Sequence, residues 1–233
     1  MKKLLNLSLA LCATLFLASF APAQKTGATQ TPQVKPKPAP TPTPAPTPAP
    51  EPFDSATVAQ MAAQCVRLET EAGTIEMKML PEAAPETVRN FLNLTAIGAF
   101  DTTTFSRVVR NFVIQGGNLS TRETLTPALA ARARRTVRDE PNEIKHVRGI
   151  VSMARSDRPH SATTNFFILV NSASHLDDTF AAFGRVTKGM NVVDAINSAA
   201  VEREQPLTPV RIGSAVVFAC APAQAAPSPT PAQ

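Results

Sequence analysis

Proline is distributed very unevenly along this chain of 233 residues. Eleven of its 22 prolines lie between Pro22 and Pro52, mostly alternating with alanine or threonine. Because proline lacks a backbone N–H and fixes φ, such a segment can build neither a helix nor a sheet. We expect residues 24–52 to be a disordered, extended linker rich in polyproline II, and residues 221–233, of similar composition, to be a disordered tail. The folded domain is therefore predicted at 53–220.

The first 23 residues have the three parts of a secretory signal peptide. Lysines at positions 2 and 3 precede an apolar run over 4–20 and a small-x-small sequence at 21–23. A membrane-spanning helix needs about 20 apolar residues and different flanks, so we expect export to the periplasm or cell envelope with no integral membrane span in the mature form. Cys12 follows a sequence similar to a lipoprotein cleavage box, but Leu11 is bulky where a small residue is needed. We therefore do not expect lipid anchoring through Cys12.

The domain is predicted to be mostly β. Residues 65–71 and 74–80 have the alternation of a hairpin around Gly73, and further strands are expected at 104–109, 112–115, 150–154, 166–170, 182–186 and 210–218. Helices are expected from Pro85 to just before Gly98 and over 190–199, and a short one over 56–64 capped by Asp54 or Ser55. Many short strands with two separated helices fit a closed antiparallel barrel capped at its ends.

Residues 105–117 contain polar side chains in an unusual place. Arg107 and Gln115 lie in apolar, β-prone segments, where an unpaired polar group would be costly. A second apolar segment follows at 150–154, and a third begins with Asn165, Phe166 and Phe167. The arrangement predicts an apolar pocket with one cation and one amide at its wall.

These motifs closely resemble the cyclophilins, the peptidyl-prolyl cis-trans isomerases, and in particular their bacterial exported subgroup. The resemblance runs through most of residues 65–218 and includes Phe183-Gly184-Arg185-Val186 and Lys188-Gly189-Met190. It implies an eight-stranded antiparallel barrel with its pocket on the outer face, acting without cofactor or metal. It also implies a monomer that accelerates X-Pro bond rotation in exported proteins and thereby assists their folding.

The resemblance assigns a role to individual positions. Arg107 matches the catalytic arginine, and Gln115 matches the residue that binds a substrate carbonyl. The positions that match a wall receiving the proline ring are Phe112, Val113, Phe167 and Leu176. Ala154 and Arg155 match the strand end that contacts the residue before proline.

Three further substrate-binding positions depart from the family pattern. Asn165 replaces a glutamine and is one methylene shorter. His175 replaces the tryptophan or phenylalanine found in other members, which implies weak inhibition by cyclosporin. Phe180 replaces a histidine. These changes bear on substrate range and rate more than on the fold.

The sequence gives less support to other functions. Three histidines are available for a Ser-His-acid set, but no Gly-x-Ser-x-Gly turn accompanies them, and the His and Cys residues lack metal-ligand spacing. The serious alternative is a cyclophilin-fold module that binds proline-containing peptides, or acts as a chaperone, with little turnover. A third possibility is that the proline-rich arm tethers the domain within the envelope.

The net charge of +5 is concentrated in one stretch of arginines, Arg122, Arg132, Arg134, Arg135 and Arg138. We expect a solvated, partly helical loop here, with contact to anionic envelope polymers or acidic clients as the alternative. No aromatic residue lies among these arginines, so nucleic acid is not expected as a partner.

Cys65 and Cys220 are the two cysteines left after signal removal, and export permits a disulfide between them. In the family fold the first and last strands are antiparallel neighbours, which brings these two positions close. Alternation raises an objection, because Cys65 alternates with polar Arg67 whereas Cys220 alternates with apolar Phe218. A bulge at Gly213 or Ser214 would remove the objection. Two free thiols remain the alternative.

Overall fold

The computed structural model describes residues 49–221. The expected signal peptide, most of the expected linker and nearly all of the expected tail lie outside the described residues. The helices are α1 (Val58–Ala62), α2 (Pro85–Ala96), α3 (Pro127–Arg132) and α4 (Met190–Asn197), with short 3₁₀ turns η1 (Leu119–Thr121) and η2 (Ser174–Leu176). The strands are β1 (Gln64–Thr70), β2 (Gly73–Met79), β3 (Arg107–Val109), β4 (Val113–Gly116), β5 (Ile150–Met153), β6 (Phe166–Leu169), β7 (Ala182–Lys188), β8 (Val201–Glu202), β9 (Gln205–Pro206) and β10 (Ile212–Ala219).

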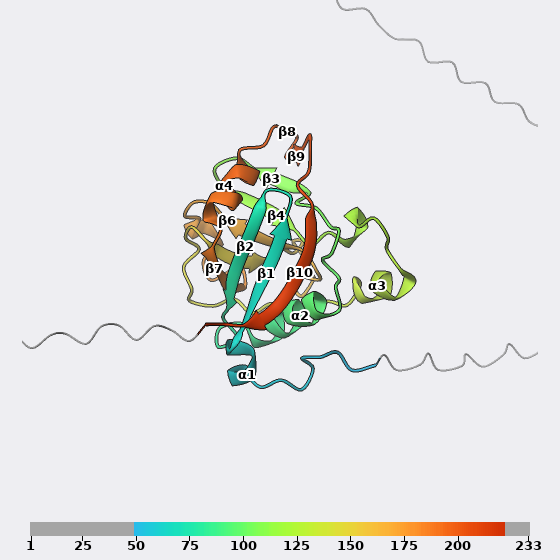
Figure 1. The fold of residues 1–233 in the computed structure, drawn as a ribbon. Helices are drawn as coiled ribbons and strands as arrows, with labels where there is room; N and C mark the ends of the chain where they lie inside the picture. Colours follow the sequence, from blue (N-terminus) through green and yellow to red (C-terminus); the bar gives the residue numbers. More distant parts are fainter. Residues whose placement is uncertain (1–48, 222–233) are drawn as a thin grey trace, which may run out of the picture. The chain divides into compact units, whose positions relative to one another are not determined.

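Eight of these strands form one strongly curled sheet in the order β10-β1-β2-β7-β5-β6-β4-β3 (Figure 1). All neighbouring strands in it are antiparallel. The two edges meet where Thr104 forms an isolated bridge with Arg211. Next to this bridge, the Phe105 N–H donates to the Val210 carbonyl oxygen over 3.0 Å. The predicted fold class is confirmed, although the barrel closes through a bridge rather than a full ladder.

Strands β4, β5 and β6 carry apolar side chains on both faces. Ile114 and Ile168 are opposite each other and point into the main core, whereas the neighbouring pair, Val113 and Leu169, belongs to a second apolar cluster on the outer face. A strand buried on both faces has a nearly continuous apolar sequence rather than an alternating one. The outer cluster provides a site for an apolar pocket without opening the core.

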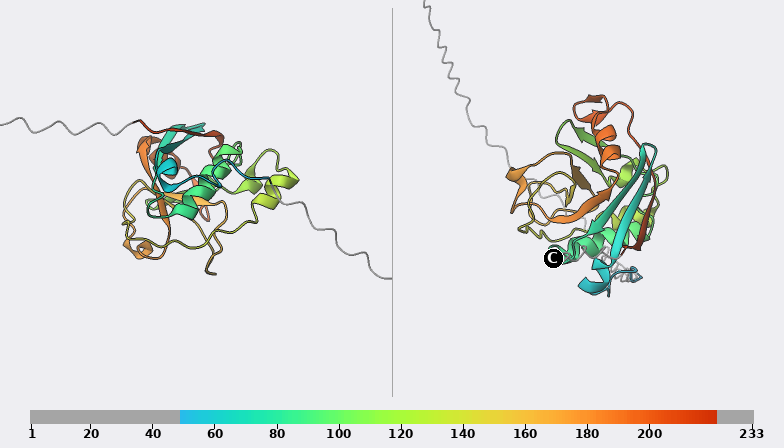
Figure 2. Two further views of the ribbon diagram at one scale, coloured as in Figure 1. Left: turned by 90° about the horizontal axis from the view of Figure 1, so that it is seen from below. Right: turned by 60° about the vertical axis from the view of Figure 1, so that its left-hand side comes forward.

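The two longer helices begin where the sequence predicts. Pro85 starts α2, and its predicted stripe of Val88, Phe91, Leu92 and Thr95 is buried. α2 packs against β10 and β7, and α4 packs against β2, β3 and β4; Figure 2 shows both helices from two further directions. α2 has 12 residues, and between residues 49 and 221 no helix combines the length and apolarity needed to cross a bilayer.

The expected cap of the short N-terminal helix is wrong. Thr57, rather than Asp54 or Ser55, caps α1 in a reciprocal box with Gln60. Asp54 instead accepts hydrogen bonds from the side chain of Asn93 on α2 and from the backbone of Glu51. α3 and the β8–β9 hairpin were not predicted individually, because each is only one short turn or pair of residues.

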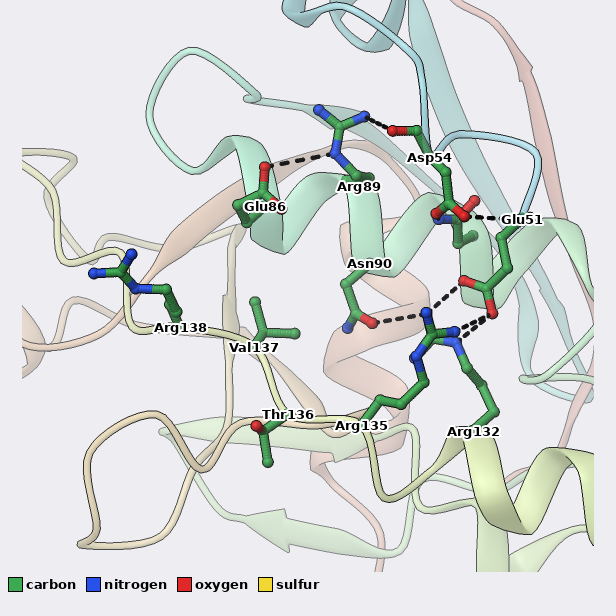
Figure 3. A pocket seen from close by; sticks show the side chains of 11 residues that line it. Glu51, Asp54, Glu86, Arg89, Asn90, Arg132, Arg135, Thr136, Val137 and Arg138 are labelled. Carbon is green, nitrogen blue, oxygen red and sulfur yellow. Dashed lines mark hydrogen bonds and ion pairs between the residues drawn. The ribbon is translucent and has the colours of Figure 1, made fainter. Parts of the chain in front are cut away.

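Glu51 joins the end of the proline-rich segment to the domain (Figure 3). Its carboxylate accepts two hydrogen bonds from Arg132, at 2.5 and 2.9 Å, and one from Arg135. Arg132 also donates to Asn90 of α2. We call this set, Glu51, Asn90, Arg132 and Arg135, the glutamate clasp. It corrects the expectation that the arginine stretch is simply a solvated loop.

Arg132 is 8 % exposed, and the Glu51 side chain 11 % exposed. Arg122 is also held, because its guanidinium donates to the carbonyl oxygens of Gly98 and Ala99. Three of the five arginines, Arg122, Arg132 and Arg135, therefore serve to fix the long segment between β4 and β5 on the barrel.

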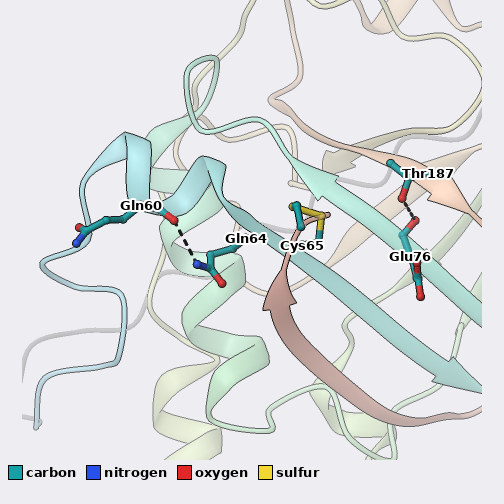
Figure 4. Close-up of a disulfide and its surroundings, with 6 residues drawn as sticks. Gln60, Gln64, Cys65, Glu76 and Thr187 are labelled. Carbon is teal, nitrogen blue, oxygen red and sulfur yellow. Dashed lines mark hydrogen bonds between the residues drawn. A yellow bond between two sulfur atoms is a disulfide. The ribbon is translucent and has the colours of Figure 1, made fainter. Parts of the chain in front are cut away.

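A disulfide joins Cys65 at the start of β1 to Cys220 just after β10, with a Cα–Cα distance of 5.1 Å (Figure 4). The register between β1 and β10 shifts at Thr70, leaving Gly213 as an extra residue in β10. Downstream of this bulge Val216 and Phe218 face outward, with the guanidinium of Arg67 stacked 4.8 Å from the Phe218 ring. The bulge expected at Gly213 or Ser214 is therefore confirmed at Gly213, and it removes the objection that alternation raised against the disulfide.

Candidate active site

One row of side chains crosses three neighbouring strands on the outer face of the sheet. Arg107, the first residue of β3, is opposite Gln115 of β4, and Gln115 is opposite Phe167 of β6. Directly opposed residues of antiparallel strands project on the same side of a sheet. The register alone thus brings a cation, an amide and an aromatic ring together.

A pocket of about 160 Å³ lies on this row. More of its exposed lining is apolar than polar, as expected for a site that accepts an apolar ring. Its lining residues are Arg107, Phe112, Val113, Gln115, Ala154, Arg155, Phe167, Leu176 and Phe180. The structure therefore brings together nine of the predicted site residues and leaves out two, Asn165 and His175.

Asn165 and His175 lie close to the pocket without lining it. The backbone carbonyl of Asn165 accepts a hydrogen bond from the Ala154 N–H at 3.0 Å, so Asn165 supports the strand end where Ala154 lies. His175 is exposed and its ring lies 5.6 Å from that of Phe112. Their roles in substrate binding stay predictions.

Two segments outside the row supply the aromatic wall. Phe112 follows the turn after β3, where Asn111 has a positive φ of 59°. The buried Asn197 of α4 fixes this turn by accepting from the Asn111 N–H and donating to the carbonyl oxygens of Val109 and Val113. Sequence reasoning missed Asn197, because its partners lie more than 80 residues away.

Leu176 and Phe180 come from the turn η2 and the residues after it. Phe180 packs edge-to-face on Phe167, with ring centroids 5.9 Å apart, and the Arg155 guanidinium stacks 5.0 Å from the Phe180 ring. Edge-to-face pairs and cation–π contacts both favour a fixed ring orientation. The replacement of the family's histidine by Phe180 thus extends the apolar wall.

The paired glycines after Gln115 have a structural role. Gly117 has a φ of 83°, and a Cβ at this position would collide with the carbonyl oxygen of Thr164. The Thr164 hydroxyl donates to the Gly117 carbonyl at 2.7 Å. Only glycine allows the end of β4 to approach the segment that leads into β6 so closely.

A buried polar chain beneath the pocket ties its walls together. His146 Nε2 lies 2.8 Å from the Ser152 hydroxyl, and Nδ1 lies 3.1 Å from Asp177, the residue after Leu176. Ser152 is opposite Phe167 on the neighbouring strand. His146 therefore connects the turn that carries Leu176 to the strand beside Phe167.

This chain contains the residue types of a nucleophilic triad but cannot act as one on a substrate. Ser152 is 0 % exposed and His146 is 1 % exposed, so no substrate can reach the hydroxyl. Burial lowers the pKa of His146, although the Asp177 carboxylate opposes this shift. The backbone N–H of His146 donates to Asp177 at 2.8 Å and lowers the pKa of that carboxyl. Sequence reasoning considered His146 for a hydrolase site and missed this supporting role.

Arg107 itself is held at two nitrogens. Its Nε donates to Glu204 Oε2 at 2.7 Å, and its Nη1 donates to Gln115 Oε1 at 3.3 Å. Glu204 belongs to the β8–β9 turn and was not among the predicted site residues. The contact joins residues 97 apart in the chain, and no local pattern could reveal it.

Comparison with known proteins identifies the family. Residues 65–217 match the family model described as cyclophilin type peptidyl-prolyl cis-trans isomerase/CLD. A peptidyl-prolyl cis-trans isomerase of Streptomyces antibioticus is 37 % identical over 170 residues, which cover 66 % of this chain and 98 % of that protein. Peptidyl-prolyl cis-trans isomerase B of Escherichia coli is 36 % identical over 148 residues, covering 59 % of this chain and 87 % of that protein.

A solved structure agrees with these sequence matches. The crystal structure of a cyclophilin type peptidyl-prolyl cis-trans isomerase of Cryptosporidium parvum, determined in the presence of the dipeptide Ala-Pro, has a TM-score of 0.59 and 26 % sequence identity. The match covers 67 % of this chain and 99 % of that one. On its family model, its relatives and its fold, the chain belongs to the cyclophilin-type peptidyl-prolyl cis-trans isomerases.

Proposed function

We propose that this isomerase acts on X-Pro segments of exported proteins, with Arg107 as its catalytic residue. Rotation about a peptide bond has a barrier of ~18–20 kcal/mol, because resonance gives the C–N bond partial double-bond character. The two isomers before proline differ by only about 0.5–1 kcal/mol. A catalyst therefore needs only to lower the barrier.

The pocket has the groups for this task. A donor aimed at the prolyl nitrogen favours the twisted state, in which that nitrogen is pyramidal and resonance is broken. The planar, always charged guanidinium of Arg107 suits this role. The apolar wall of Phe112, Val113, Phe167 and Leu176 would hold the proline ring, and Gln115 would donate to a flanking carbonyl while the other half of the bond turns.

One observation carries this proposal. Arg107 and Gln115 both line a predominantly apolar pocket, and they are in contact with each other. Each decade of acceleration requires about 1.4 kcal/mol of selective stabilisation of the transition state. A charged donor at the rim of an apolar pocket supplies such selectivity without a nucleophile.

Peptide titration tests where the substrate binds. Addition of Ala-Ala-Pro-Phe to isotope-labelled protein should shift the resonances of Phe112, Gln115 and Phe167, while Ala-Ala-Gly-Phe should leave them in place. Shifts confined to the opposite side of the barrel, around the Cys65–Cys220 disulfide, would contradict the assignment of the pocket.

Export is the second part of the proposal. The signal-like sequence of residues 1–23 supports it, and so does the Cys65–Cys220 bridge, because disulfides persist mainly in oxidising compartments. Mass spectrometry of the protein recovered from cell fractions should find a mature form beginning near Gln24 in the periplasmic or envelope fraction. An intact Met1 form confined to the cytoplasm would contradict export.

A further inference from the structure

The β8–β9 hairpin reaches across to the first strand of the site. The Val108 N–H donates to the backbone carbonyl of Glu204 over 2.8 Å, which docks the hairpin turn on β3. On the neighbouring residue, Arg107, the Nε donates to the Glu204 carboxylate over 2.7 Å. Backbone and side chain of Glu204 thus bind two consecutive residues of β3.

The guanidinium of Arg107 is consequently fixed at two positions. Glu204 holds Nε, and Gln115 holds Nη1 from the neighbouring strand. The Arg107 side chain is 41 % exposed, and a long exposed side chain without such contacts would sample several rotamers. Within the described residues, Nη2 makes no hydrogen bond, so this end of the planar fork is left for a ligand.

The turn that presents Glu204 has an uncommon backbone. Arg203 and Glu204 both have positive φ values, 47° and 69°. Two-residue hairpin turns with this geometry favour asparagine and glycine, and a larger residue in the left-handed region is strained. In this turn the two contacts that Glu204 makes to β3 offset the backbone strain.

We propose that Glu204 is a positioning residue for the isomerase reaction, acting through Arg107. The inference rests on the catalytic role proposed for Arg107. The carboxylate orients the guanidinium plane so that Nη2 faces the prolyl nitrogen. It also restricts the Arg107 side chain to few rotamers beforehand, so that less conformational entropy is lost in the transition state. Neutral acceptors can replace part of this effect, because geometry rather than charge is what Glu204 supplies.

A set of variants measured in the full mature chain tests the proposal. Glu204→Ala should lower kcat for a proline tetrapeptide about fivefold, the upper range for an exposed ion pair, and leave KM within about twofold. Glu204→Gln, which keeps an oxygen acceptor, should retain at least about half of the wild-type kcat. Glu202→Ala is the matched control: it removes the same charge from the same hairpin, and within residues 49–221 the Glu202 side chain makes no hydrogen bond or ion pair. It should behave as wild type.

The decisive measurement repeats Glu204→Ala in an Arg107→Ala background. If Glu204 acts through Arg107, it should have no further effect there. Equal losses of activity in both backgrounds would show a structural role of the hairpin and overturn the proposal, as would unchanged kcat in Glu204→Ala alone. Wild-type activity in Arg107→Ala alone would instead overturn the catalytic role of Arg107, so the two failures are distinguishable.

Discussion

Arg107 shows how one side chain depends on residues far from it in sequence. Its place at the pocket follows from strand register, and its orientation follows from Gln115 and Glu204. Arginine suits this environment because its planar fork can bind two protein acceptors and still keep a free donor. We therefore expect catalysis to depend on the neighbours of Arg107 as well as on its charge.

Asn165 is the departure from the family pattern for which we predict the largest effect on rate. Its side chain makes no hydrogen bond within the described residues, and a glutamine side chain would be one methylene longer. We predict that Asn165→Gln keeps or raises kcat/KM, measured with a proline tetrapeptide, while Asn165→Ala changes little. A clear loss in Asn165→Gln would show that the pocket has packed around asparagine.

Protonation of the buried chain beneath the pocket should make stability depend on pH. Burial holds the pKa of His146 below its unfolded value of about 6.5, so the unfolded chain binds more protons between the two values. The contribution of His146 is therefore present above about pH 6.5 and is lost as the pH falls through the folded pKa. Asp177 acts in the same direction at lower pH, since its folded pKa is also depressed below about 3.9.

Thermal melts between about pH 7.5 and about pH 5.5 test this effect. The Tm of the wild type should fall over this range. His146→Gln should have a lower Tm at the higher pH, because it disturbs the contacts to Ser152 and Asp177, but should lose less on acidification. Equal losses in both proteins would contradict the role of His146.

Among the secondary-structure elements, the glutamate clasp fixes the start of the domain on α2, on the end of α3 and on the segment after α3. Removing Glu51 would leave the buried guanidinium of Arg132 without its counter-ion. We predict that Glu51→Ala lowers the free energy of unfolding by about 3 kcal/mol, measured by urea denaturation. Glu82→Ala is the control, because Glu82 is exposed and unpaired within residues 49–221, and it should change stability little.

The first and last strands of the sheet are joined by the Cys65–Cys220 bridge, which closes a loop spanning 155 positions. A cross-link of this size restricts the unfolded chain and should contribute roughly 3–5 kcal/mol. Reductant should therefore lower the stability of the wild type by this amount and have no effect on the double variant Cys65→Ser/Cys220→Ser. Two titratable thiols in the oxidised, exported protein would show that the bridge does not form.

For the whole molecule, local patterns predicted most of the barrel. The hairpin of β1 and β2, the start of α2 at Pro85 and the strands around the pocket follow from alternation, proline position and apolar runs. Nine pocket residues could be named because the family motif fixes their spacing within short segments. The fold class was thus accessible from the sequence.

Contacts between distant segments could not be predicted in this way. Glu204, Asn197 and Glu51 each act through partners some 80 or more residues away, and nothing in their own neighbourhood distinguishes them from surface polar residues. The outward direction of Phe218 depends on the bulge at Gly213, which the sequence offered as one of two possibilities because glycine inside a strand often marks a bulge. The roles of these residues are set by contacts between distant segments rather than by local sequence patterns.

We propose that the domain acts by presenting Arg107 to a prolyl peptide bond in this pocket. A protease-coupled isomerase assay on Ala-Ala-Pro-Phe tests this role of Arg107. We expect the wild type to accelerate isomerisation, and Arg107→Ala to lose about a hundredfold in kcat/KM, or about 2.7 kcal/mol of transition-state stabilisation, with an unchanged circular dichroism spectrum. Arg110→Ala, which removes an exposed arginine outside the pocket, should keep full activity. Near-wild-type turnover by a folded Arg107→Ala variant would contradict the catalytic role of Arg107.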